Sequence, residues 1–447
     1  MSARRINQAL ALIGAASLFS NVHAEKLDVR DAIKEALASN PQVLSEMREV
    51  DARDREVRQA LAGYYPTVDL VAAYGFQEID PAVSRDPFTG EILNSGPNGR
   101  TRNELERGEV QLSMRQLVFD GYKTDYEYKN QQARFKSARH RTKSVAEDVS
   151  LQVVRVYLEV LKREAILDIA QEALAFHEDV YNRMKKRHES GAGSKADLDQ
   201  ISGRLALART NVVTSTTNLV DARSNFQRVV GRFPNEGELV MPGTYRKYLP
   251  EGVGTAVERA IVNHPLLDSA NADIEAVSHS YEQSKSSFYP SFHIEAQRDI
   301  NNNINGTEGQ VDDLQVMLRM RYNLFNGHAD TARKQQFAHL VEKAKEIRNN
   351  AHRAVEEETR LAWAAHESLN MQMPALEAHV TNSLATREAY TQQFDLGRRT
   401  LLDLLNTENE YIDARIAHQL AWHDVLYHEY RIFHAMGDLM YMVGAKL

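Results

Sequence analysis

Histidine is the residue type in this chain that most readily binds metals or moves protons, and its spacing builds no site. The 447 residues contain 16 histidines and no cysteine. Four histidines, His418, His423, His428 and His434, are separated by five or six residues. Two metal ligands on one helix face lie three or four residues apart, as in the HExxH motif, which is absent. We therefore predict no metal site and expect these histidines to be solvated or packed between helices.

The sequence also lacks the motifs of enzymes and of nucleic-acid-binding proteins. It contains no G-x-G-x-x-G, P-loop or G-x-S-x-G motif, and without cysteine it has no thiol nucleophile and no disulfide. Its 54 lysines and arginines against 62 aspartates and glutamates give a net charge of −8, whereas nucleic-acid binders carry a basic surface. We predict that the protein is not an enzyme, needs no cofactor and binds no nucleic acid.

Two acidic motifs remain as candidates for a polar site. Ser194-x-x-Asp197 and Thr400-x-x-Asp403 both fit a capping box, with Asp in place of the commoner Glu. A carboxylate in the first turn of a helix also interacts favourably with the helix dipole. Arg398 and Arg399 precede only the second motif. The sequence therefore predicts two helix starts, one of them next to two arginines.

An internal duplication places these motifs in the chain. Tyr65-Pro66 matches Tyr289-Pro290 at an offset of 224 residues, and Phe119-Asp120-Gly121 matches Phe325-Asn326-Gly327 at an offset of 206. Each copy has the order helix, proline, strand, loop, strand, F-[DN]-G, very long helix, glycine-containing turn, long helix, glycine. Further pairs keep the offset of 206: Gly191 with Gly397, Asp197-Leu198 with Asp403-Leu404, and Gly231 with Gly437.

The segments between the helices alternate between apolar and polar residues. In 313–325, leucine, valine and methionine alternate with polar residues that include Arg319 and Arg321. About ten residues with this period match an outer-membrane β-barrel strand, and a half-buried strand of a soluble sheet alternates too. Arg319 and Arg321 would line the lumen of a barrel or form structural salt bridges. We predict membrane strands at about 66–78, 109–119, 291–300 and 313–325, with an exposed loop (79–108) between the first two.

Long helices make up the rest of each copy. Residues 122–189 contain no proline and no glycine, which corresponds to about 100 Å of helix at 1.5 Å per residue. Apolar residues here and in the returning segment follow a narrow heptad stripe, which is typical of a coiled-coil seam. The short link SGAGSKAD at 190–197 predicts an antiparallel hairpin, and the second copy repeats it. Pro374 should kink the longer helix of that copy.

The first 24 residues are typical of a secretory signal peptide. Arg4 and Arg5 precede the apolar stretch ALALIGAASL at 9–18, and Val22-His23-Ala24 fits a cleavage site. No later segment reaches 18 consecutive apolar residues, so the sequence predicts no transmembrane helix. We expect an exported protein whose mature chain begins at Glu25.

Four strands are too few to close a membrane barrel, because the smallest such barrels have eight and open edges are not tolerated in lipid. Three copies would supply twelve strands. The helical hairpins are about three times as long as a bilayer is thick, so they must extend into the periplasm and pack into a tube. The predicted fold is mainly α with a small β part: long antiparallel coiled-coil helices, and four strands per protomer of a 12-stranded trimeric β-barrel.

The order and spacing of these features resemble the TolC family of trimeric outer-membrane export channels. The shared features are the duplicated order, the Tyr-Pro strand entries, the F-[DN]-G strand exits, and Gly397-Arg398-Arg399-Thr400 followed by Asp403-Leu404. The resemblance covers essentially the whole mature chain and implies an α-helical barrel in the periplasm. It divides the chain into a signal peptide (1–24), a first repeat (25–231), an equatorial segment (232–254), a second repeat (255–437) and a C-terminal tail (438–447).

The resemblance also implies a gate at the helix–helix turns, at the periplasmic end. Asp403 matches an aspartate that rings the aperture and binds cations, and Arg399 matches an arginine that latches neighbouring coils. The family's second aspartate ring falls on Asn406 here, which halves the carboxylates and puts a strong block by divalent cations in doubt. Asp197 is the matching carboxylate of the first turn and a candidate partner of Arg399. We favour the cap for Asp197 and the gate for Asp403, and one residue can fill both roles.

The partners follow from the same resemblance, which makes the protein the outer-membrane exit duct of a tripartite export machine. They are a homotrimer of this chain, a periplasmic adaptor protein, an inner-membrane transporter, the exported cargo and outer-membrane lipid. The adaptor would dock on the turns, at Gly191, Ser194, Gly397 and Thr400.

The cargo is the least determined part of this expectation. Overall similarity favours type I secretion of a large adhesin or toxin-like protein by an ABC transporter, and small-molecule efflux with a proton-driven pump is the alternative. A secreted coiled-coil structural protein is an explanation of another class. It accounts for the heptads and the signal peptide but not for four lipid-length strands in duplicated positions.

Overall fold

The computed structural model describes residues 26–79, 88–89, 103–305 and 308–445. The predicted signal peptide, the middle of the predicted loop 79–108 and the last two residues of the tail lie outside these ranges. The first copy of the repeat contains α1 (Val29–Ser39), α2 (Pro41–Leu61), β1 (Thr67–Ile79), β2 (Asn103–Phe119), α3 (Lys123–Glu189) and α4 (Lys195–Val230). The second contains α5 (Val253–Asn263), α6 (Pro265–Ser284), β3 (Ser291–Asn302), β4 (Gln310–Arg321), α7 (Ala329–Asp395) and α8 (Leu401–Ala435), followed by α9 (Leu439–Val443).

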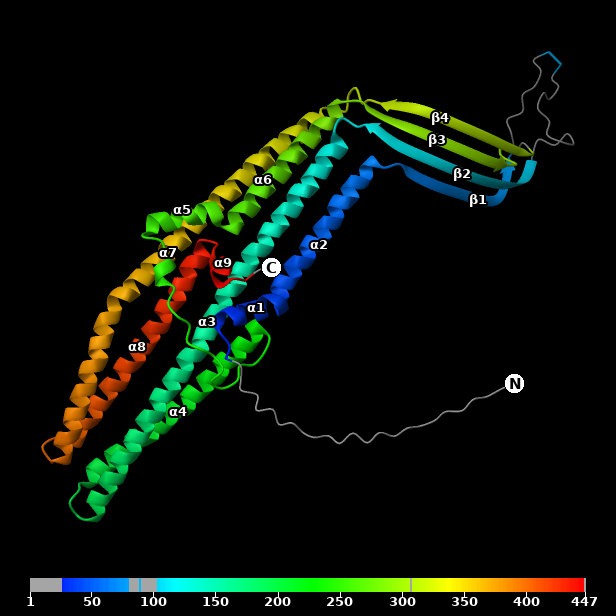
Figure 1. Cartoon of the computed structure of the whole chain (residues 1–447). Helices are drawn as coiled ribbons and strands as arrows, with labels where there is room; N and C mark the ends of the chain where they lie inside the picture. The colour runs from blue at the N-terminus through cyan, green and yellow to red at the C-terminus, as the bar shows by residue number, and fades with distance from the viewer. Residues whose placement is uncertain (1–25, 80–87, 90–102, 306–307, 446–447) are drawn as a thin grey trace, which may run out of the picture.

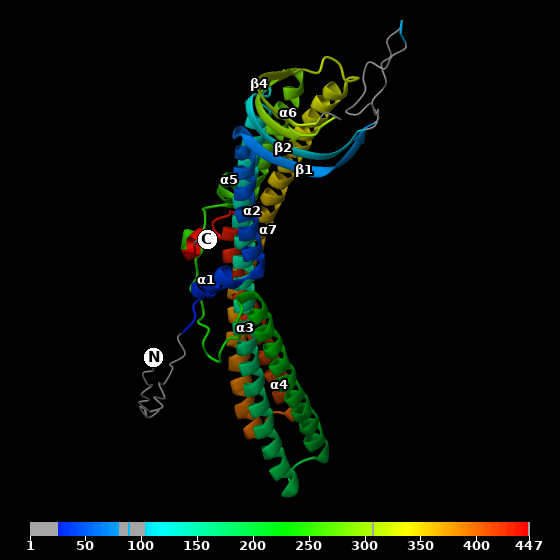
Figure 2. The same ribbon diagram turned by 90° about the vertical axis from the view of Figure 1, so that its right-hand side faces the viewer.

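The four strands form one antiparallel sheet in the order β1-β2-β3-β4 at one end of the molecule (Figure 1). Cross-strand partners such as Leu70 and Leu112, or Ile294 and Leu318, point to the same face. This register gathers large apolar side chains on one face, each between 39% and 78% exposed: Val68, Leu70, Tyr74, Phe76, Leu112, Ile294, Leu314, Val316, Leu318 and Met320. The opposite face carries polar and charged residues. Figure 2 shows that the sheet is curved, and β1 and β4 form its two edges.

Two strands, β2 and β4, differ from the sequence-based expectation by three residues or more at one or both ends. β2 begins at Asn103 instead of 109, because Asn103–Gly108 pairs with the end of β1. β4 runs from Gln310 to Arg321 instead of 313–325. Its last residue pairs with Ser291, the first residue of β3, and Pro290 before it has no N–H to continue the ladder. Residues 322–325 therefore leave the sheet.

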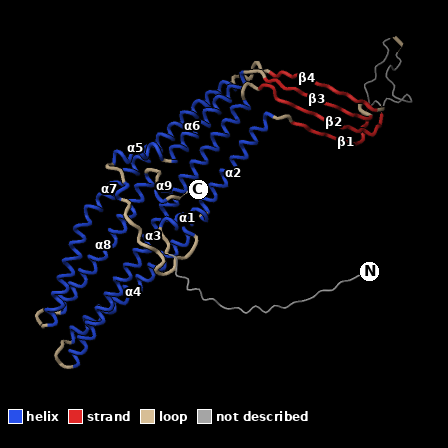
Figure 3. The backbone as a smooth tube through the Cα atoms, viewed as in Figure 1, coloured by secondary structure: helices blue, strands red, loops and turns tan. Residues whose placement is uncertain are grey.

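Two antiparallel helical hairpins extend away from the sheet. Hairpin one consists of α3 and α4, hairpin two of α7 and α8, and the turns of both lie at the end furthest from the strands (Figures 1 and 3). α3 and α7 contain 67 residues each, about 100 Å of helix. α7 continues through Pro374, and its ribbon is curved rather than broken (Figure 1). Among the described residues, no helix combines the length and apolar character needed to cross a membrane.

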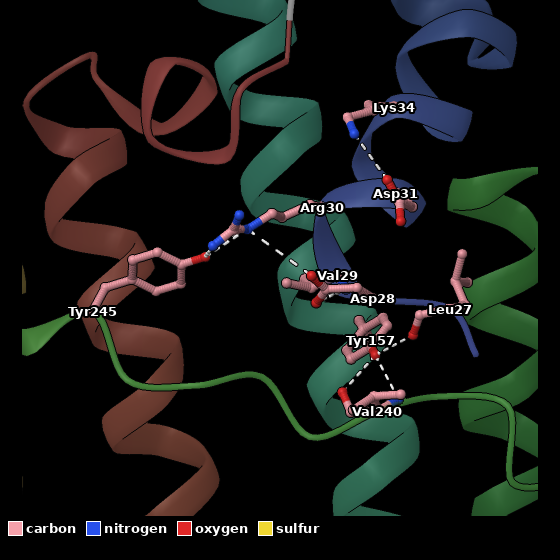
Figure 4. Close-up of polar contacts among 9 residues, drawn as sticks. All are labelled: Leu27, Asp28, Val29, Arg30, Asp31, Lys34, Tyr157, Val240 and Tyr245. Carbon is pink, nitrogen blue, oxygen red and sulfur yellow. Dashed lines mark hydrogen bonds and ion pairs between the residues drawn. The ribbon is translucent and has the colours of Figure 1, made fainter.

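The hydrophobic core lies halfway along the molecule, where α1, α3, α4 and α8 meet. Its fully buried aromatic residues are Tyr157, Phe226, Tyr430 and Phe433. The Tyr157 hydroxyl lies 2.7 Å from the carbonyl oxygen of Leu27 and 2.6 Å from that of Val240, whose N–H donates to it at 2.8 Å (Figure 4). These bonds tie the segment between the repeats to α3. The predicted fold class, mainly α with a small antiparallel sheet of four strands, is confirmed.

Candidate functional site

The two hairpin turns share one backbone geometry. In the first, Gly191 has φ +78° and the N–H of Ala192 donates to the carbonyl of Arg187 at 2.9 Å. In the second, Gly397 has φ +71° and the N–H of Arg398 donates to the carbonyl of Gln393 at 2.8 Å. Both are Schellman motifs, in which a residue in the left-handed conformation lets the last helical carbonyls be satisfied. Glycine at this position avoids the steric cost of a Cβ atom.

The starts of the returning helices differ. The Thr400 hydroxyl oxygen accepts the N–H of Asp403 at 3.2 Å, and the Asp403 carboxylate accepts the N–H of Thr400 at 3.2 Å. This is the complete capping box that the sequence predicts. Ser194 caps α4 through the N–H of Ala196 at 3.1 Å. Asp197 does not close a box there, and within the described residues its side chain has no hydrogen bond or ion pair. The capping box that we expected at Asp197 is therefore not formed: Ser194 caps α4, and Asp197 is the acidic residue of its first turn.

Asp403 is held in its charged form at the tip. Hydrogen bonds from the Thr400 hydroxyl, at 2.9 Å, and from the Thr400 N–H lower the pKa of the Asp403 carboxyl, and the charge of Arg399 lowers it further. Asn406 lies three residues further along α8 and is exposed. Residues three apart share a helix face, so Asp403 and Asn406 follow one another along α8.

Arg399 is held by its own helix rather than by the first turn. Its Nε donates to Gln393 Oε1 at 3.0 Å, and its guanidinium lies 4.2 Å from the centroid of the Tyr390 ring. Among the described residues of one chain Arg399 forms no ion pair with Asp197, and the pairing stays a prediction for the assembled trimer. Within the chain, the Arg399 side chain instead contacts Tyr390 and Gln393, which lie on the last turns of α7.

Contacts between the hairpins fix the position of both turns. An apolar cluster near the tips joins Val180, Met184 and Ile201 of hairpin one to Phe394, Leu401, Leu404 and Leu405 of hairpin two. The Arg183 Nη1 donates to Asp395 at 2.8 Å, and the Arg187 guanidinium lies 5.1 Å from the centroid of the Phe394 ring. The heptad pattern predicted apolar seams along these helices but missed the two arginines, because a heptad does not identify the partner helix.

The polar face of the sheet carries the two arginines predicted for a lumen. Arg319 Nε donates to Glu295 at 2.6 Å, and Arg115 of β2 donates to the same carboxylate at 2.9 Å. Arg319 therefore lies on the polar face and also takes part in a salt bridge. Arg321 follows two residues later on the same face, at the end of the sheet next to the helices.

The histidines of α8 are packing residues in the described structure. His423 is 1% exposed, and burial lowers its pKa. Burial also lowers the pKa of His428, whereas His434 lies 2.8 Å from the Asp148 carboxylate. In the part of the chain that the structure describes, no three histidine, aspartate or glutamate side chains are grouped to hold a metal ion.

Comparisons with known proteins agree over nearly the whole chain. The family model "Outer membrane efflux protein" matches residues 32–232 and 256–438. Outer membrane protein TolC of Vibrio cholerae is 22% identical over 434 residues, which covers 95% of this chain and 93% of the relative. Outer membrane efflux protein BepC of Brucella suis is 20% identical over 373 residues, covering 82% and 81%. The crystal structure of VceC, also from Vibrio cholerae, has the same fold, with a TM-score of 0.74 at 16% identity and coverage of 92% and 96%.

Proposed function

Because this chain belongs to the outer membrane efflux protein family, we propose that three copies of it form a single duct through which an export machine discharges its cargo. The protein resides in the outer membrane, and its helical part lies in the periplasm. The sheet forms one third of a 12-stranded barrel, and the two hairpins form one third of a helical tube.

The division of the sheet into two faces carries this proposal. One face is mainly a layer of exposed apolar side chains, suited to lipid, interrupted by Glu106 and by the ion pair of Arg298 with Asp312 towards the end furthest from the helices; the other face is mainly polar, suited to a water-filled lumen. Within one protomer, β1 and β4 leave the backbone groups of two edges unpaired. Unpaired groups in lipid cost several kcal/mol each, so the edges pair with those of neighbouring copies.

The second hairpin turn serves as the periplasmic gate. Asp403 presents a carboxylate that stays ionised, and three copies place three such charges around one axis. Arg399 lies beside it and is held by Tyr390 and Gln393, from where it reaches a neighbouring protomer. A periplasmic adaptor docks on the same tips, at Gly191 and Ser194 of the first turn and Gly397 and Thr400 of the second.

The cargo class is the finer part of the proposal. We favour a large adhesin or toxin-like protein supplied by an inner-membrane ABC transporter, on the overall resemblance to channels of type I secretion. Small-molecule efflux with a proton-driven pump uses the same outer-membrane part, and the name of the relative BepC, an efflux protein, favours this second function. A strain lacking the gene separates the two: loss of a secreted protein supports the first, and sensitivity to dyes and antibiotics without such a loss supports the second.

Extraction from outer membranes in mild detergent tests the duct, followed by single-channel recording in planar bilayers. We expect a native mass of three mature chains, each slightly below the 50.7 kDa of the full sequence. Asp403→Ala and Arg399→Ala should raise the conductance of the resting channel, and Asp197→Ala, the matched change in the first turn, should leave it unchanged. A monomer would overturn the duct. A trimer in which neither variant alters conductance would reduce Asp403 to a helix cap.

A further inference from the structure

Six side chains behind the tips form a cluster that connects the two hairpins. We call it the arginine clamp. It consists of Glu172 and Phe176 of α3, Arg387 of α7, and Glu408, Tyr411 and Arg415 of α8. Arg387 lies eight residues before the end of α7, about 12 Å behind the second turn. The clamp is separate from the capping box and from Arg399.

The inner half of the clamp is a cation enclosed by two rings and a buried carboxylate. Arg387 forms an ion pair with Glu408, whose side chain is 3% exposed. The Arg387 guanidinium lies 4.9 Å from the centroid of the Phe176 ring and 5.2 Å from that of the Tyr411 ring. The electron-rich faces of both rings attract the guanidinium charge. Since Phe176 belongs to hairpin one, this contact crosses between the hairpins.

The outer half repeats the crossing one helical turn away. Arg415 donates to Glu172 through Nη2 at 3.3 Å, and its guanidinium lies 5.5 Å from the Tyr411 ring centroid. Glu172 and Phe176 are four residues apart on α3, so they lie on one helix face. Both arginines of hairpin two therefore meet the same face of α3, on either side of Tyr411.

The duplicated positions of hairpin one contain no such cluster. Tyr181, Ser202 and Leu205 stand where hairpin two has Arg387, Glu408 and Tyr411, at the offset of 206. The counterpart of Arg415 is Arg209, which donates to Glu178 of its own hairpin at 3.2 Å. The clamp is therefore a property of hairpin two, the hairpin that carries Arg399 and Asp403.

We propose that the arginine clamp positions hairpin two against hairpin one and so determines how readily the second turn moves away from the channel axis. This inference rests on the gate proposed above, for which the clamp residues are positioning residues. Removing Arg387 leaves Glu408 as an unpaired charge in a buried site, a strongly unfavourable state that separation of the hairpins relieves by admitting water. Removing the Glu172 charge weakens only the outer half.

Two variants and one matched control test the clamp in the full trimer. Because the chain has no cysteine, Lys195→Cys and Leu396→Cys introduce the only labelling sites, and both positions are exposed. Electron–electron distance measurements on spin labels at these sites report the separation of the hairpins. Arg387→Ala should raise the ratio of separated to closed hairpins about tenfold, and Glu172→Gln by a smaller factor. Arg360→Ala, which removes an exposed ion pair with Glu356 on the same helix, should change nothing.

Conductance of the same trimers separates failure of the clamp from failure of the gate. Wider separation together with higher conductance supports both. Wider separation at unchanged conductance overturns the gate and leaves the clamp as the contact that positions the hairpins. A wild-type distance distribution in both Arg387→Ala and Glu172→Gln overturns the clamp. Glu172→Gln keeps the test valid if Arg387→Ala does not assemble, because Glu172 is 62% exposed and takes no part in the buried pair.

Discussion

Hairpin one and hairpin two are built to the same dimensions from different side chains. α3 and α7 contain 67 residues each, α4 and α8 contain 36 and 35, and both turns have a glycine in the left-handed conformation followed by the same backbone hydrogen bond. Between that glycine and the helix cap, the first turn has Ala192 and Gly193, whereas the second has Arg398 and Arg399. The backbone requirements of a hairpin fix the glycine and the cap in both turns. Between them, a Cβ atom at Gly193 would lie 2.9 Å from the backbone nitrogen of His188, whereas the second turn carries an arginine at the matching position.

The far ends of the hairpins show the same relation. Gly231 follows α4 and Gly437 follows α8. Each lies where another helix with proline at its first position begins, α2 or α6: Gly231 lies beside Ser39, the last residue of α1, and Gly437 lies beside His264 and Pro265. Asn40 caps the first of these helices by accepting the N–H of Gln42 at 2.9 Å. His264 caps the second by accepting the N–H of Leu266 at 3.2 Å. We call these two contacts, of Gly231 with the start of α2 and of Gly437 with the start of α6, the joints of the repeats. They share a backbone geometry, but they differ in how tightly the glycine is packed and in whether the capping residue can be protonated, and both differences can be measured.

The largest expected effect is at Gly437. A Cβ atom there would lie 2.8 Å from Pro265 Cδ and 2.9 Å from His264 Cα, at φ +73°. Gly437→Ala should therefore lower the free energy of unfolding by about 2–5 kcal/mol. The cost combines the strain of alanine in the left-handed conformation with a clash against the Pro265 ring and the His264 backbone, which cannot rotate away. Gly231 has φ +100°, and a Cβ atom there would lie 3.1 Å from the Ser39 hydroxyl, so Gly231→Ala should lower the free energy of unfolding by about 1–2 kcal/mol. Thermal unfolding of the detergent-solubilised trimer, followed by circular dichroism, ranks the two.

Ser39 provides a control for the comparison of the two glycine variants. Ser39→Ala removes the hydroxyl nearest to Gly231 and should reduce the loss in Gly231→Ala, while it leaves Gly437→Ala unaffected. Equal losses at the two glycines would mean that the joint of the second repeat relaxes around the new methyl group. The two ends would then be equivalent in packing.

The second prediction concerns acid sensitivity at the same joint. Burial, and next the charge of His434, lower the pKa of His264 from 6.5 to about 4. A protonated ring cannot accept the N–H of Leu266, so the folded state favours the neutral form. The unfolded chain binds the proton at higher pH, so stability is complete above pH 6.5 and is lost as the pH falls towards about 4, by up to about 3 kcal/mol. His264→Asn, which copies Asn40, should flatten this part of the stability–pH curve.

Comparison of the wild type with His264→Asn at each pH isolates the histidine from its neighbours. Glu147 also lies near His434, and burial raises its pKa from 4.5 to about 7, so its contribution changes with pH in the opposite direction. It is present in both proteins and cancels in the difference. Parallel stability–pH curves for the two proteins would contradict this prediction, because they would show that protonation of His264 costs no stability.

The elements of both repeats could be predicted from the sequence because their periods are strong. Alternation over ten residues and uninterrupted heptads give strands and helices without reference to the rest of the chain. The start of β2 could not be predicted, since Asn103–Gly108 is rich in charge and resembles a loop. The backbone of this segment pairs with β1 although its side chains are polar, and Glu106 accepts a hydrogen bond from the Tyr74 hydroxyl at 2.8 Å.

The candidate site was predicted only in part, and the limit has a physical cause. The capping box of Thr400 and Asp403 is a local pattern, and the sequence identifies it. Arg387 and Glu172 are more than 200 residues apart, and a heptad shows which face of a helix is buried but not which helix covers it. Within the protomer Arg399 contacts Tyr390 and Gln393 of α7, and its pairing with Asp197 stays a prediction for the assembled trimer.

The smallest expected effect lies at the caps of the returning helices. Thr400→Ala removes the hydroxyl that accepts the N–H of Asp403 and donates to the Asp403 carboxylate, and it keeps the backbone N–H of Thr400; it should destabilise the first turn of α8 by about 1–2 kcal/mol. Ser194→Ala removes one bond and should destabilise the first turn of α4 by about 0.5–1 kcal/mol. These losses are local, so amide hydrogen exchange in peptides that cover the two turns is the suitable measurement. Exchange should accelerate more in the second turn than in the first.

Asp403→Asn separates the cap from the charge in this last comparison. The asparagine oxygen still accepts the N–H of Thr400, so exchange in α8 should stay close to that of the wild type, while the negative charge is lost. If Asp403→Asn raises the conductance of the trimer without faster exchange, the carboxylate acts in the gate through its charge. If it accelerates exchange as much as Thr400→Ala does, the charge acts through the helix dipole, and the second turn differs from the first only in the strength of its cap.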